Sequence, residues 1–116
     1  MKYLCLVYGE EALLDAMSRE QADHLTKISI AYDDELARQG KLILAQALES
    51  VRTAKTVRVR NKKISTTDGP FAETKEQLLG FVHVEAADQA EALAIASKIP
   101  LAQIGSIEVR PILELS

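Results

Sequence analysis

The segment "TTDGPFAETKEQLLGF", residues 66–81, is the least ordinary stretch of this 116-residue sequence, and it joins two regions that both resemble strands. Asp68, Gly69, Pro70 and Phe71 occupy four consecutive positions within it. Pro70 fixes its own φ angle and disfavours helical backbone at Gly69, which we expect to be extended. The segment therefore predicts a stiff connection that either only reverses the chain or forms the wall of a site.

Strand-like alternation flanks this segment on both sides. Before it, residues 54–61 alternate valine with arginine, and a short return strand near Ile64 completes a hairpin. After it, residues 78–86 alternate valines with Phe81 and His83. The sequence thus predicts a hairpin, the stiff connection and a further strand, in that order.

Two helices are predicted farther from the segment. Residues 19–39 carry apolar side chains at steps of three and four, and Ser18 with Gln21 forms a capping-box pattern before them. Gly40 is expected just beyond the end of this helix. The second helix, 89–98, has Asp88 as its expected N-cap.

The face that the second helix turns to the sheet is predicted from its spacing. A narrow stripe of small and apolar residues recurs at helical steps and is expected to face inward: Ala90, Leu93, Ala94 and Ser97.

Further strands are predicted at 2–8, 41–49 and 105–115. Without the small hairpin, the order is β-α-β-β-α-β, the ferredoxin-like pattern, in a single α+β domain spanning 1–116. Helices would cover one face of an antiparallel sheet. The other face, with apolar residues of the first strand and Phe81, also needs cover, which a homodimer packing two sheets face to face would provide.

Composition excludes several classes of function. The net charge of −3 leaves no overall footprint for nucleic acid, and no apolar run approaches the roughly 20 residues of a membrane span. Cys5 stands alone, so no internal disulfide or cysteine-rich metal cluster is expected. We expect a cytoplasmic protein with no signal peptide, metal or cofactor, which binds neither a membrane nor nucleic acid directly.

A basic run interrupts this acidic composition. Residues 51–67 hold six lysine and arginine residues and no acid. Aromatic residues, which would stack on bases, do not interleave with them. A solvated strand face is therefore the favoured interpretation, and a contact surface for an acidic partner is the alternative.

Two histidines are candidates for chemistry. His24 lies early in the first helix and could exchange protons near neutral pH, or it could be an ordinary surface residue. His83 lies within a strand, where it could line a ligand cavity between two sheets or a subunit interface.

The other candidates surround the opening segment or end the chain. Asp68 could point into a pocket walled by Phe71, with Gly69 and Pro70 holding the loop, or it could only accept hydrogen bonds within a turn. Arg110 could bind an anionic substrate or pair with acids on neighbouring strands.

The sequence resembles the YCII-related family and, within it, the DGPF-domain branch. The resemblance runs through "MKYLCLVYG", through "TAKTVRVRNKKISTTDGPFAETKEQLLGF" and through "IPLAQIGSIEVRPILEL". It implies a ferredoxin-like fold that dimerises into an α/β barrel.

The resemblance also bears on catalysis. A related branch of the family has a proposed His–Asp active site, and the step His24–Leu25 is similar to its histidine motif. Ile99 stands before Pro100 where that branch has its aspartate. We therefore hypothesise that Asp68 supplies the carboxylate from another loop.

Two functions follow from these observations. The first is a cofactor-free small-molecule enzyme of the lyase or isomerase type, in which His24 and Asp68 act as an acid–base pair. The alternative is a non-catalytic dimeric ligand-binding or regulatory module. Relatives of the branch occur alongside extracytoplasmic-function sigma factors, which suggests a link to transcription.

Overall fold

β1 (Lys2–Gly9) is the inner strand around which the structure is organised. In the computed structural model, which describes residues 1–115, β1 pairs with strands on both sides and every pair is antiparallel. The four-stranded sheet has the order β2-β5-β1-β6, where β2 is Leu42–Ala47, β5 is Gln77–Glu85 and β6 is Ser106–Pro111. The predicted strands are all present, although β6 ends at Pro111 and not at residue 115.

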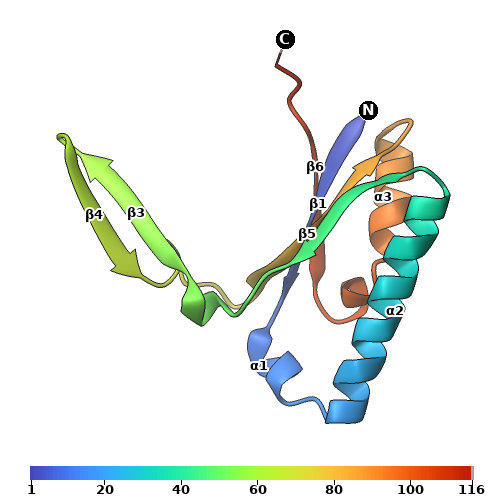
Figure 1. Ribbon diagram of the computed structural model, residues 1–116, viewed down its shortest axis with the longest axis horizontal. Helices are drawn as coiled ribbons and strands as arrows, with labels where there is room; N and C mark the ends of the chain where they lie inside the picture. Colours follow the sequence, from blue (N-terminus) through green and yellow to red (C-terminus); the bar gives the residue numbers. More distant parts are fainter. Residues whose placement is uncertain (116) are drawn as a thin grey trace.

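The helices lie on one face of this sheet (Figure 1). They are α2 (Arg19–Arg38) and α3 (Gln89–Ser97), while the short α1 (Glu11–Asp15) follows β1. Short 3-10 turns, Val51–Thr53 and Pro100–Gln103, precede β3 and follow α3. The described residues therefore form a mixed α+β fold with antiparallel sheets and three α-helices, and a single chain closes no barrel.

Alternation along β1 divides its side chains between two environments. Tyr3, Cys5 and Val7 are buried beneath the helices, where they join Val82 and Val84 of β5 in the core. The residues between them on β1 point to the opposite face and are only partly buried. Each residue's position in the strand decides its environment, because successive side chains point to opposite faces.

Local signals placed α2 correctly. Ser18 and Gln21 form the capping box, in which each side chain accepts a hydrogen bond from the other residue's backbone N–H. Gly40 follows the helix with a φ angle of 72°, the left-handed conformation expected after a helix end. Leu36 is the fully buried member of the apolar stripe.

The predicted inner face of α3 is wrong. Asp88 does cap the helix by accepting a hydrogen bond from the Glu91 backbone, but Ala92, Ile95 and Ala96 are the buried residues. All members of the predicted stripe are exposed. Apolar residues surround this short helix, so the spacing does not select a face, and contacts with the sheet decide it.

β3 (Lys55–Arg60) and β4 (Lys63–Asp68) form a separate hairpin, which we call the arm, residues 55–68. The arm projects from the sheet on the side away from α2 and α3 (Figure 1). Its turn places Asn61 and Lys62 at φ angles of 50° and 65°, as two-residue hairpin loops require. The predicted hairpin is confirmed, and it belongs to neither edge of the main sheet.

Hydrogen bonds hold the base of the arm to the rest of the chain. The Gly69 N–H donates to the Ala54 carbonyl at 2.7 Å, and the Thr56 hydroxyl donates to the Gly69 carbonyl at 2.8 Å. The Glu11 carboxylate accepts from the Val51 N–H at 2.7 Å. The first two bonds continue the pairing of the arm at its base, and the third joins the turn that precedes the arm to α1.

Truncations on α3 test its orientation. Ile95 is 5% exposed and Leu93 is 50% exposed. We expect Ile95→Ala to lower the free energy of unfolding by about 2–5 kcal/mol, because it opens a cavity in the core. Leu93→Ala, the matched control, should change it by less than about 0.5 kcal/mol. Urea unfolding followed by circular dichroism measures both, and the reverse ranking would contradict this orientation.

Candidate functional site

The uncovered face of the main sheet gathers polar side chains among apolar ones. Strand register places one residue from each strand in a single row: Leu44, His83, Leu4 and Arg110. The next row on the same face is made in the same way: Gln46, Phe81, Leu6 and Glu108. This face, which we call the open face, thus brings Phe81 and His83 of β5 together with Arg110, which lies 27 positions after His83 in the sequence.

His83 has an unusual environment on the open face. Its Nε2 atom is buried and has no hydrogen-bond partner within residues 1–115. A buried polar atom without a partner costs about 1–3 kcal/mol, so such atoms are rare in folded proteins. Side chains of the same chain cover this atom, so a ligand atom or a group of a second subunit reaches it only if those side chains move aside.

Arg110 lies in the same row as His83, with the β1 strand between them. Its guanidinium is 3.9 Å from the Glu108 carboxylate, and both side chains are largely exposed. Such an exposed ion pair contributes little stability, about 0–1 kcal/mol. The guanidinium thus remains available to an incoming anion.

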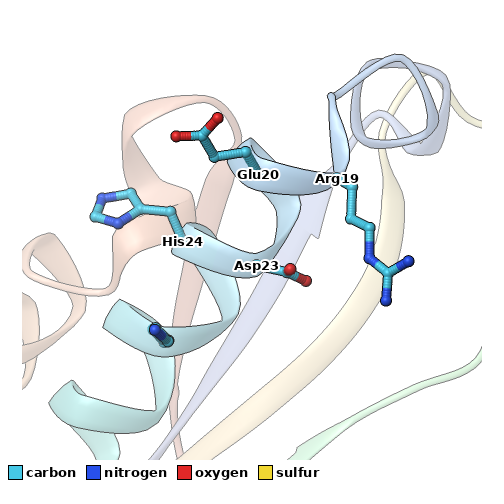
Figure 2. Close-up of a pocket in the computed structure, with 5 residues that line it drawn as sticks. Arg19, Glu20, Asp23 and His24 are labelled. Carbon is cyan, nitrogen blue, oxygen red and sulfur yellow. The ribbon is translucent and has the colours of Figure 1, made fainter.

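His24 lies on the exposed surface of α2, one turn after its start. It lines a shallow, open depression together with four charged neighbours from the same helix: Arg19, Glu20, Asp23 and Lys27. The labelled side chains radiate from the helix and do not converge on one point (Figure 2). Within one chain, this surface alone forms no enclosed site.

Asp68 ends β4 at the base of the arm. Its carboxylate pairs with Lys55 on the facing strand and does not cap a turn. Gly69 adopts a φ angle of 96°, open to glycine but strained for other residues, in place of the extended backbone expected from Pro70. Phe71 is exposed. The segment from Asp68 to Phe71 therefore faces solvent in a single chain.

His24 and Asp68 are not brought together within one chain. The arm and α2 lie on opposite sides of the main sheet (Figure 1), and Asp68 does not line the depression around His24. The proposed pair remains a prediction that requires a residue from a second copy.

Ile99 is 6% exposed and belongs to the hydrophobic core. An apolar core residue therefore occupies the position at which the resemblance noted in the sequence would imply an aspartate in a related branch. Ile99 therefore cannot provide a carboxylate for a catalytic pair at this position.

Two titratable residues, Cys5 and Tyr32, have raised pKa values. Burial raises the pKa of the Cys5 thiol to about 11, so Cys5 is not a reactive nucleophile. Burial, with a smaller effect of Glu35, raises the pKa of Tyr32 to about 12. The Tyr32 hydroxyl donates a 2.7 Å hydrogen bond to the Ile95 carbonyl and so joins α2 to α3. Both roles are structural.

Two further observations concern residues 1–115 as a whole. No three His, Cys, Asp or Glu side chains gather there in a way that could hold a metal ion. None of the helices in this range is long and apolar enough to cross a membrane.

Comparison with known proteins agrees with the resemblance read from the sequence. The family model of the YCII-related domain matches residues 1–116. The chain belongs to the YCII-related family. An uncharacterized protein of Rhizobium meliloti (strain 1021) is 37% identical over 114 residues, which cover 97% of this chain and 92% of that protein.

The YCII-related domain covers the whole sequence, residues 1–116. Membership of this family does not by itself assign a reaction. The relative's name states no activity. The finer assignment to the DGPF-domain branch remains a prediction from residues 66–81. The open face, the arm and their side chains carry the remaining structural clues to function.

Proposed function

We propose that this YCII-related protein acts as a homodimer that binds a small anionic molecule between its subunits. In this dimer, two ferredoxin-like sheets pack face to face through their open faces and form an α/β barrel. One observation carries the proposal: helices cover one face of the main sheet, while apolar residues of β1 and β5 line the other. A second copy offers the same apolar surface, as two-fold symmetry requires.

The side chains of the open face favour a particular class of ligand. Leu4, Leu6 and Phe81 supply apolar walls, and His83 supplies a buried nitrogen with no partner. Arg110 offers a planar guanidinium that binds carboxylates through two hydrogen bonds. Its strand lies two strand spacings from that of His83, about 10 Å. A carboxylate on an apolar or aromatic body fits this arrangement.

A dimer of this kind provides a setting for either activity considered from the sequence. As a ligand-binding module it would change shape or affinity for another protein when the ligand binds, and a regulatory role in sigma-factor-dependent transcription would be of this type. As an enzyme it would need an acid–base group beside the bound molecule. His83 and Arg110 bind the ligand in both cases.

Substitution on the open face tests the dimer. Leu44 is 45% exposed on this face, so Leu44→Glu should be tolerated by the folded chain. We expect it to convert the dimer to a monomer, because it places a charge within an apolar interface. Leu93→Glu puts the same charge on the exposed side of α3 and should leave the dimer intact. Light scattering after size exclusion measures the mass, and a monomeric wild-type protein would contradict the proposal.

Ligand binding is tested with benzoate as the probe and benzamide as its uncharged control. We expect benzoate to shift the NMR signals of His83 and Arg110 more than benzamide does. Arg110→Gln should weaken benzoate binding by roughly tenfold to a hundredfold, the usual effect of losing a charged hydrogen bond. Arg38→Gln, on α2, is the matched control and should have no effect.

His83→Leu separates a binding role from a structural one in the same assay. It should not lower the free energy of unfolding, because it removes a buried atom that has no partner. It should nevertheless weaken benzoate binding. Unchanged binding in both His83→Leu and Arg110→Gln would remove the open face as the ligand site.

The acid–base enzyme is the second candidate, and the geometry around Asp68 favours it in one respect. Asp68 and Phe71 are exposed beside a projecting arm, where a neighbouring subunit can reach them. His24 is equally exposed on α2. His24 of one subunit would exchange the proton, and Asp68 of another would orient it, in a lyase or isomerase reaction without a cofactor. Because α2 lies on the face opposite the open face, this pair needs a subunit contact other than the one between open faces.

Spectroscopy tests this pair without knowledge of the substrate. If the two residues meet between subunits, Asp68→Asn should shift the imidazole NMR signals of His24. Glu73→Gln, an exposed carboxylate of the same segment, is the control and should leave them unchanged. Identical His24 signals in wild type and Asp68→Asn would exclude the pair.

A further inference from the structure

The arm has one apolar and one basic face. Strand register places three apolar side chains on the same face: Val57, Val59 and Ile64. The other face carries Arg58, Arg60 and Lys63. The apolar residues are 61%, 55% and 74% exposed. The arm is therefore amphipathic, and its apolar face is uncovered in a single chain.

An arm with this composition needs a surface to cover it. A two-stranded hairpin is marginally stable by itself in water, and three or more strands or another packed element are usually required. Exposed apolar residues gathered on one face of such a hairpin mark a contact surface. The hydrogen bonds at Gly69 and Thr56 continue the pairing of its two strands at the base, and the one at Glu11 joins the preceding turn to α1.

The opposite charges of the arm and of the rest of the chain favour a second copy of this chain as the partner. Residues 51–67 hold six cations and no acid, and the other 99 residues hold eight cations and 17 acids, a net charge of −9. The arm itself holds five of these cations and one acid, Asp68, a net charge of +4, and the body, residues 1–50 and 69–115, holds eight cations and 16 acids, a net charge of −8. The arm of one copy is therefore attracted to the body of another. Two arms repel each other, so contact between arms is disfavoured.

The position of the arm agrees with this partner. It projects on the side away from the helices, which is also the side of the open face (Figure 1). A second copy packed on the open face would lie within reach of the arm. One symmetric contact then covers two apolar surfaces that a single chain leaves exposed. It also helps to reach the roughly 800 Å² per subunit that a stable interface buries.

We infer that the arm clasps the partner subunit in the dimer: its apolar stripe of Val57, Val59 and Ile64 docks on the partner's body and carries residues 68–71 to the subunit boundary. This inference rests on the proposed dimer and adds that each ligand site takes residues from both subunits. Asp68 and Phe71 of one copy then border the site of the other. The stiff segment at Gly69 and Pro70 sets where they lie.

Single-cysteine variants of the whole protein test the clasp. Ile64→Cys reports on the apolar face, and Lys63→Cys, the neighbouring residue on the basic face, is its matched control. The native Cys5 is buried and has a pKa of about 11, so a maleimide reagent meets only the introduced thiol. We expect Ile64→Cys to react about tenfold more slowly than Lys63→Cys in the dimer, because docking excludes the reagent.

The same pair in the Leu44→Glu background identifies what covers the arm. In a monomer the clasp is lost, so both cysteines should react at similar rates. Protection of Ile64→Cys that persists in the monomer would mean that the arm folds onto its own chain, and it would overturn the inference.

Failure of the clasp can be distinguished from failure of the proposed dimer. Equal reaction rates in a wild-type protein that light scattering shows to be dimeric would overturn the clasp and leave the dimer standing. A wild-type protein that is monomeric at every concentration would overturn both.

Discussion

The pairing of β1 with β5 on one side and β6 on the other is the interaction on which the rest of the structure depends. It places β1 inside the sheet and gives its alternate side chains two different faces. Tyr3, Cys5 and Val7 form the core with the helices, and the residues between them form the open face. Because α2 and α3 both lie on one side, helices cover one face of the sheet, and the other face leaves apolar residues uncovered.

The uncovered face of the sheet connects the candidate site to the arm. Both lie on the side of the sheet without helices, and both expose apolar groups that a single chain does not cover. The polar groups of the open face, His83 and Arg110, lie among these apolar residues, which is the usual composition of a small-molecule site. The proposed ligand site between subunits and the proposed clasp of the arm both rest on this uncovered surface.

Much of the local structure was predictable, because it depends on residues close together in the sequence. The capping box of α2, the glycine after it and the hairpin of the arm all follow from short patterns, and all are confirmed. The face of α3 was predicted wrongly. Its alternate alanines leave no side clearly more apolar than another, so Ile95 and the contacts with the sheet decide its rotation.

The candidate site shows the same division. From the sequence, His24 and His83 were equally good candidates, since each was a single histidine within an amphipathic helix or strand. The structure separates them: His24 is an exposed residue among radiating charges, and the Nε2 of His83 is buried with no hydrogen-bond partner among residues 1–115. Sequence spacing could not have placed Leu4 between His83 and Arg110, because that row exists only through the register of three strands.

The opening segment shows what each level contributes. By itself, the sequence determined the hairpin and membership of the YCII-related family, because each depends on local geometry or on a contiguous motif, whereas the extended backbone expected at Gly69 was wrong. Only the tertiary structure showed that Gly80 is needed where β2 approaches β5, since a Cβ there would lie 2.5 Å from the Gln46 carbonyl oxygen. It alone decided which side chains share the open face, because strand pairing joins residues that are dozens of positions apart.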